Sequence, residues 1–129
     1  AREGKAGEVF LPASRLAPGY PFSVIMFGPS ILSRGDDAGI RFLRAYLRAV
    51  ARYAEGKTER NIEILAKVTQ LEPDLLRRIC WPVIPLDGKI EAKAIAGYSA
   101  WAAEQGLADR PLTPNEIWAP QYLEEARKQ

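Results

Sequence analysis

The sequence predicts a mostly helical protein with a minor β component. Apolar residues recur at helical spacing over several long segments. Only one segment, residues 22–27, carries the aromatic and β-branched residues typical of a buried strand. The 129 residues suit about one domain, and 47% hydrophobic and 26% charged residues are ordinary for a folded one. We therefore expect a single domain with five or six helices and one strand.

The N-terminal quarter of the chain is expected to be irregular. Pro12, Pro18 and Pro21 interrupt it repeatedly, and only residues 8–11 could form a short extended piece before the strand. Gly28 and Pro29 should end the strand at residue 27 and start a short helix through residue 32. This pattern divides the chain into an irregular segment with one strand, residues 1–35, and a helical segment, residues 36–129.

The strongest predicted element is a helix over residues 37–55. Asp36 or Asp37 could cap its N-terminus, and Gly56 could end it. Its apolar side chains cover roughly 180° of the circumference, more than the roughly 100° of an ordinary surface helix. The opposite side carries a narrow arginine stripe: Arg41, Arg44, Arg48 and Arg52. We interpret the stripe as a solvated face, the alternative being a grip on phosphates or anionic lipid.

The rest of the helical segment shows clear start and stop signals. Further helices are expected from residue 58 to a break at 71–72, then over residues 74–80, 90–105 and 120–127. Residues 81–85 read as an extended apolar connector, followed by a turn at Asp87-Gly88. Thr113 before Pro114 reads as a helix cap followed by proline at the first helical position.

The composition argues against catalysis and metal binding. The chain has no histidine, which removes the commonest general base and the commonest metal ligand. The single cysteine, Cys80, lies in an apolar stretch beside Trp81 and is interpreted as a buried thiol. No phosphate-binding glycine loop or zinc spacing occurs. We therefore predict no catalytic residues, no metal site, no cofactor and no enzymatic activity.

The charge balance and hydropathy exclude two further classes of partner. A net charge of +2, from 18 basic and 16 acidic residues, is too balanced to indicate a nucleic-acid-binding protein. No apolar run approaches the roughly 20 residues of a membrane span.

One strand alone cannot satisfy its backbone hydrogen bonds in a core. Either another copy contributes strands, so that the isolated chain forms a homodimer, or the sheet lies partly in another segment.

Three segments resemble parts of a known family. They are residues 40–49 (IRFLRAYLRA), residues 87–89 (DGK) with the helix that ends at Gly106-Leu107, and residues 121–126 (QYLEEA). In this order they are similar to the C-terminal part of ABC-transporter solute-binding proteins of the aliphatic-sulfonate, nitrate and thiamine-precursor group. The resemblance covers residues 20–128 and implies the C-terminal portion of a two-lobed α/β periplasmic-binding-protein fold of type II.

The resemblance also implies a function for the protein and a location in the cell. It implies capture of a small molecule for import, an ABC-transporter permease as partner, and a periplasmic or extracellular membrane-associated location in a bacterium. The strand would be a hinge-side strand, and Tyr20 and Phe22 beside it would be the residues most able to reach a ligand. Two alternatives stay open: a helical protein-interaction module, and a fragment of an enzyme related to thiamine-pyrimidine synthases. That enzyme class depends on histidine, which this chain lacks.

Overall fold

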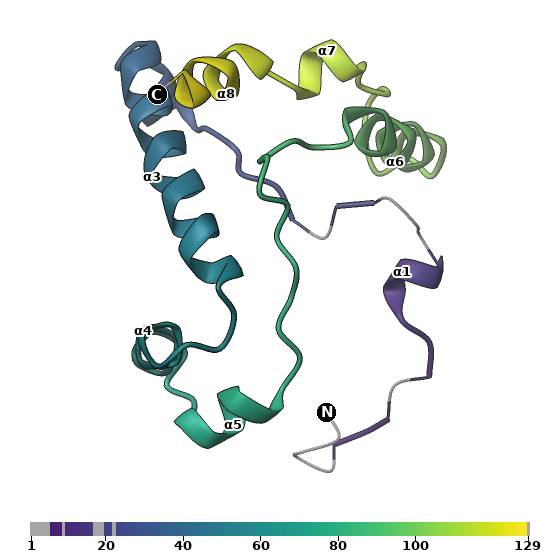
Figure 1. Ribbon diagram of the computed structural model, residues 1–129. Helices are drawn as coiled ribbons and strands as arrows, with labels where there is room; N and C mark the ends of the chain where they lie inside the picture. The colour runs from purple at the N-terminus through teal and green to yellow at the C-terminus, as the bar shows by residue number, and fades with distance from the viewer. Residues whose placement is uncertain (1–5, 9, 17–19, 22, 129) are drawn as a thin grey trace. The chain divides into compact units, whose positions relative to one another are not determined.

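The computed structural model describes residues 6–8, 10–16, 20–21 and 23–128 (Figure 1). This part of the chain is mostly helical, as predicted. Its helices are α1 (Ala13–Leu16), α2 (Pro29–Leu32), α3 (Asp36–Ala54), α4 (Glu59–Thr69), α5 (Pro73–Arg78), α6 (Ala92–Glu104), α7 (Pro114–Ile117) and α8 (Pro120–Arg127). The chain divides into two compact units: Ala1–Met26 with Ile90–Ala119, and Phe27–Lys89 with Pro120–Gln129. The boundary predicted at residue 35 falls inside the second unit.

The predicted strand is the main correction to the fold. Residues 23–27 are irregular, and no strand occurs anywhere in the described ranges. Phe22 and Val9 lie outside those ranges, and the described neighbours of Val9 show no strand either. The reason is physical: a strand exists only when a second strand accepts and donates its ladder hydrogen bonds. The described residues supply no such partner, so the minor β component is not formed.

Helix α3 begins and ends through backbone conformation rather than through a capping side chain. Gly35 is its N-cap with φ +80°, so the prediction that Asp36 or Asp37 caps the helix was wrong. Both aspartates instead lie in the first turn, where a negative charge is stabilised by the helix dipole. Gly56 follows the helix with φ +85°, a left-handed conformation that glycine adopts without steric cost.

The second unit is closed by helix α8, which packs against α3 (Figure 1). Val50 of α3 and Leu123 and Ala126 of α8 are among its buried apolar side chains. At the start of α3, Gly39 is buried, and the ring of Tyr122 meets the ring of Phe27 edge-on with centroids 5.6 Å apart. A side chain at residue 39 would occupy the space that these two rings fill.

A polar junction joins α3, α4 and α5. Thr58 caps α4 by accepting a hydrogen bond from the Asn61 backbone N–H, and the Asn61 side chain donates to the carbonyls of Arg52 and Gly56. The Lys57 ammonium donates to the carbonyls of Arg77 and Ile79, at 2.7 and 2.6 Å. These bonds satisfy carbonyls that the end of a helix leaves free. Helix α5 ends at Arg78, two residues earlier than predicted.

The connector between α5 and α6 is extended, as predicted, but its cysteine is not buried. Cys80 is exposed, so the interpretation of a buried thiol was wrong. The neighbouring Trp81 takes the sheltered position instead: its ring stacks on Tyr53 with centroids 4.6 Å apart. Its indole N–H donates to the Tyr53 carbonyl, and this bond holds the connector against the end of α3.

In the first unit, helix α6 packs against α7. Gly106, with φ +71°, follows α6 closely, as the sequence predicted. Thr113 is the N-cap of α7 and Pro114 its first residue, again as predicted. None of the residues of α6 is fully buried.

Two glycines inside helices allow a matched test of this packing. A Cβ at Gly39 would lie 2.8 Å from Phe27 Cε2 and 3.0 Å from Tyr122 Cδ1, whereas at Gly97 the nearest atom is the Tyr20 hydroxyl at 3.3 Å. We expect Gly39→Ala to destabilise the chain by about 1–3 kcal/mol through overpacking. Gly97→Ala should be neutral or stabilising by up to about 1 kcal/mol, because alanine favours helix. Urea denaturation followed by circular dichroism measures both, and equal effects would contradict the described packing of α8 on α3.

Candidate functional site

Of the two predicted ligand-facing residues, the structure describes one. Tyr20 lies in the first unit, is 45% exposed, and places its hydroxyl against the backbone of α6 at Gly97. Phe22, the second predicted residue, lies outside the described residues. Whether the two form one ligand-facing wall therefore stays a prediction.

Helix α6, which meets the Tyr20 hydroxyl at Gly97, carries two aromatic side chains that the sequence did not group with Tyr20. Gly97 and Trp101 are four residues apart on α6 and so share a face of the helix. The rings of Trp101 and Tyr98 lie 5.3 Å apart, and both remain about half exposed. The residue in the sequence that could have indicated this site is Gly97. Glycine destabilises the interior of a helix, so its presence there can indicate that another group approaches the backbone closely. The candidate site of the first unit is therefore Tyr20 with the α6 face of Gly97 and Trp101.

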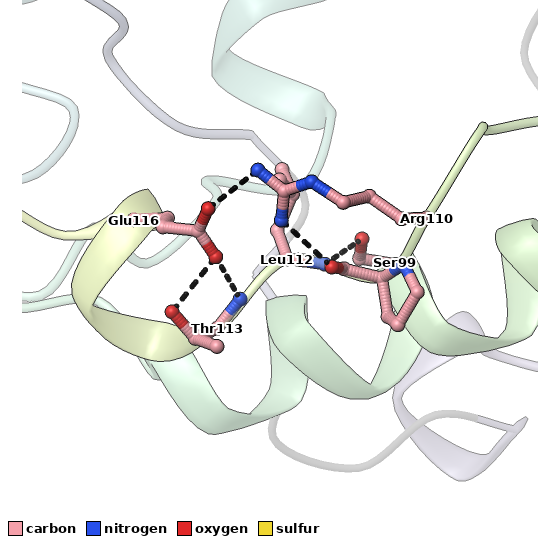
Figure 2. Close-up of polar contacts among 6 residues, drawn as sticks. Ser99, Arg110, Leu112, Thr113 and Glu116 are labelled. Atoms are coloured by element: carbon pink, nitrogen blue, oxygen red, sulfur yellow. Dashed lines mark hydrogen bonds and ion pairs between the residues drawn. The ribbon is translucent and has the colours of Figure 1, made fainter.

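A compact polar cluster fixes the loop between α6 and α7 (Figure 2). Glu116 accepts hydrogen bonds from the Arg110 guanidinium at 2.6 Å and from both the backbone N–H and the hydroxyl of Thr113 at 2.9 Å. Ser99 of α6 accepts a hydrogen bond from the backbone N–H of Leu112 at 2.9 Å, which ties the loop to the helix. The Glu116 carboxylate and its donors satisfy one another, so we assign the cluster a structural role.

The arginine stripe of α3 is largely the solvated face that the sequence predicted. Arg41 pairs with Asp37 and Arg52 with Glu55, and all four side chains are about half exposed or more. Arg44 departs from the pattern: it is half buried and donates to the Glu125 carbonyl of α8 at 3.4 Å. Its buried Nε–H has no hydrogen-bond partner within the described part of the chain. Arg44 thus contributes to the packing of α3 on α8 rather than to an anion-binding surface.

Metal-ligating residues do not gather in the part of the chain that the structure covers. Histidine, cysteine, aspartate and glutamate form no group of three or more that could hold a metal ion among those residues. Likewise, no helix within the described ranges combines the length and apolar character needed to cross a membrane.

The Glu116 cluster yields a prediction for pH. Hydrogen bonds from Arg110 and Thr113 lower the pKa of Glu116 from 4.5 to about 2. Because the folded pKa is lowered, the stabilisation is present above pH 4.5 and is lost as pH falls through about 2. We expect Arg110→Met to raise the pKa of Glu116 more than Thr113→Val does, since the Arg110 hydrogen bond is the larger cause and Thr113→Val keeps the backbone bond. Carboxyl-carbon NMR titration measures both, and an unchanged pKa in Arg110→Met would contradict the described ion pair.

The chain was also compared with known proteins. No protein-family model matches it, and neither the curated proteins nor the solved structures gave a match.

Proposed function

We propose that this chain is the C-terminal helical part of the solute-binding component of an ABC transporter, which captures a small molecule for import. The proposal starts from the sequence resemblance carried by residues 40–49, by residues 87–89 with the helix that ends at Gly106-Leu107, and by residues 121–126. The observation that supports it best is that residues 40–49, residues 87–89 and residues 121–126, far apart in sequence, lie together in the second unit. The helix of the second resembling segment, α6, lies in the first unit. Residues 40–49 lie in α3 and residues 121–126 in α8, and the two helices pack together.

The turn at Asp87-Gly88 lies against both α3 and α8. A Cβ on Gly88 would lie 3.1 Å from Leu47 Cδ2 of α3 and 3.2 Å from Leu123 Cδ1 of α8. Gly88 has φ +63°, so both its conformation and its surroundings favour glycine. The Arg127 guanidinium of α8 donates to the Asp87 carbonyl.

In this proposal the chain contributes binding surface and packing but no catalysis. A solute-binding protein holds its ligand between two lobes, so each lobe supplies only part of the contacts. Tyr20 has the right chemistry for such a wall, because its exposed ring offers an apolar face and its hydroxyl a polar one. The partner would be a transporter permease, and the protein would work on the extracytoplasmic side of a bacterial membrane.

A helical interaction module is the second candidate, and exposed apolar residues favour it. On α4, Ile64 is 47% exposed and Val68 is 74% exposed, and the two lie one turn apart on the same face. Such neighbours mark surface that another polypeptide can cover. The two candidates differ in ligand: a solute-binding protein takes up a small molecule, whereas an interaction module takes up a protein.

Calorimetric titration separates these candidates. The panel contains sulfonates, nitrate, pyrimidines and aromatic carboxylates, tested against this chain and against the product of its complete reading frame. We expect the 129-residue chain to bind none of them tighter than about 1 mM, roughly 4 kcal/mol, because part of the contacts is missing. The product of the complete reading frame should bind one of them at micromolar concentration. Micromolar binding by the chain alone would show a complete site and end the proposal, as would no binding by the complete product.

Tyr20 provides the residue-level test in the complete product. Tyr20→Ala should weaken binding of the ligand found above by at least about tenfold, the equivalent of about 1.4 kcal/mol of lost contacts. Tyr20→Phe separates the loss of the hydroxyl from the loss of the ring. Phe10→Ala is the matched control, because Phe10 is an aromatic residue of the same unit that is 99% exposed. Equal affinities of the Tyr20→Ala variant and the unaltered protein would remove Tyr20 from the site.

A further inference from the structure

The connector between α5 and α6 carries two prolines three residues apart, Pro82 and Pro85. A proline fixes its own φ at roughly −65°. It also drives the residue before it, here Trp81 and Ile84, out of the helical region and into extended conformations. The sequence thus restricts most of residues 81–85 to extended backbone, and in the structure they form no helix, strand or turn (Figure 1).

The backbone of this connector is not hydrogen-bonded as a strand would be. Among the described residues, the N–H groups of Val83 and Ile84 and the carbonyls of residues 81–84 take part in no backbone hydrogen bond. The next bond along the chain joins the Gly88 N–H to the Pro85 carbonyl, at 3.2 Å. Polyproline II is the extended helix that has no internal hydrogen bonds and repeats every three residues. The connector has the bonding pattern of that helix.

Side-chain exposure along the connector also repeats every third residue. Trp81 and Ile84 are half buried, and the ring of Trp81 stacks on Tyr53 of α3. The four residues that complete the two turns are all exposed: Pro82, Val83, Pro85 and Leu86. A strand alternates with a period of two, whereas polyproline II has a period of three. The connector therefore presents two neighbouring apolar ridges, one formed by Pro82 and Pro85 and one by Val83 and Leu86.

The connector is held at both of its ends. The Trp81 indole N–H donates to the Tyr53 carbonyl at 3.1 Å. The turn that follows the connector places Gly88 beside Leu47 of α3 and Leu123 of α8. A segment that is already fixed in its bound conformation loses little conformational freedom when a partner binds, and this favours affinity.

We propose that residues 82–86 are a docking segment for a protein domain that binds polyproline II in a groove lined by aromatic side chains. The two apolar ridges fill such a groove. Its tyrosine and tryptophan side chains supply rings for the ridges and O–H and N–H donors for the connector's carbonyls. The inference goes beyond the proposed function, because it concerns a contact with another protein and not the capture of a small molecule.

Other kinds of partner fit this segment less well. A partner strand needs a row of N–H donors opposite it, and Pro82 and Pro85 have none. An anionic lipid surface or a nucleic acid needs basic side chains, and residues 79–88 contain neither lysine nor arginine. The polyproline II groove is the partner that requires what the connector has: proline, apolar side chains and unpaired carbonyls.

A titration with purified SH3 and WW domains, two kinds of domain that bind polyproline II, tests this docking. The 129-residue chain is labelled for amide NMR, and the product of its complete reading frame is titrated by calorimetry. We expect at least one domain to bind both with a Kd below about 1 mM, with the largest amide shifts at Val83, Ile84 and Leu86. Binding by no domain would overturn the proposal, as would shifts centred on another segment. Binding by the chain but not by the complete product would show that another part of the protein covers the segment, and would overturn it too.

Two exposed valines of the second unit provide the matched control. Val83 is 93% exposed on the connector, and Val68 is 74% exposed on α4. Val83→Asp should weaken binding of the domain found above at least about tenfold, because it places a charge in an apolar groove. Val68→Asp should leave the affinity unchanged, and circular dichroism checks that both variants are folded. Equal affinities of the two variants, or a loss in Val68→Asp alone, would overturn the proposal.

Pro85→Ala separates polyproline II recognition from simple apolar contact. It keeps the carbonyl that accepts the Gly88 hydrogen bond but removes the proline ring and the fixed φ. We expect it to weaken binding at least about threefold, because the segment is no longer fixed before the partner binds. Unchanged affinity in Pro85→Ala would show that the partner does not recognise polyproline II.

Discussion

The packing of α8 on the beginning of α3 is the constraint on which the second unit depends. It requires the absence of a side chain at Gly39, because the rings of Phe27 and Tyr122 fill that space. The Tyr122 hydroxyl donates to Asp36 at 2.8 Å, and this bond raises the pKa of Tyr122. Leu123 then reaches the glycine of the Asp87-Gly88 turn. Because residue 39 is glycine, α8 can contact both the first turn of α3 and the Asp87-Gly88 turn of the connector that precedes α6.

The helices were predictable where local chemistry decides them. Proline at a first turn placed α2, α5, α7 and α8, and the glycines after α3 and α6 placed their ends. The sequence could not show that Gly35 rather than an aspartate caps α3, because either residue type suits an N-cap. At the early end of α5, the carbonyl of Arg77 accepts a hydrogen bond from Lys57, which lies 20 residues before it. Such a contact leaves no signal in local periodicity.

The strand and the burial of single side chains could not be predicted, because both depend on a second segment of the chain. Residues 22–27 have strand composition, but pairing is a property of two segments, and the described chain contains only one candidate. The same holds for the apolar arc of α3: Val50 is buried, whereas Leu43 is half buried and Phe42 is 45% exposed. A helix pattern shows which face is apolar but not how much of that face a neighbour covers. Cys80 was expected to be buried and is exposed for the same reason: the sequence does not show that the ring of Tyr53 covers Trp81 and leaves Cys80 uncovered.

The central claim is that α8 packs against the start of α3 and so holds the second unit together. Nuclear Overhauser cross-peaks test this packing most directly. The ring protons of Tyr122 should show strong cross-peaks to the α-protons of Gly39, because a Cβ on Gly39 would lie 3.0 Å from Tyr122 Cδ1. They should also show cross-peaks to the ring of Phe27, whose centroid is 5.6 Å away. Spectra with both sets of cross-peaks are the predicted result. A Tyr122 ring with cross-peaks only to neighbours within α8 would contradict this packing.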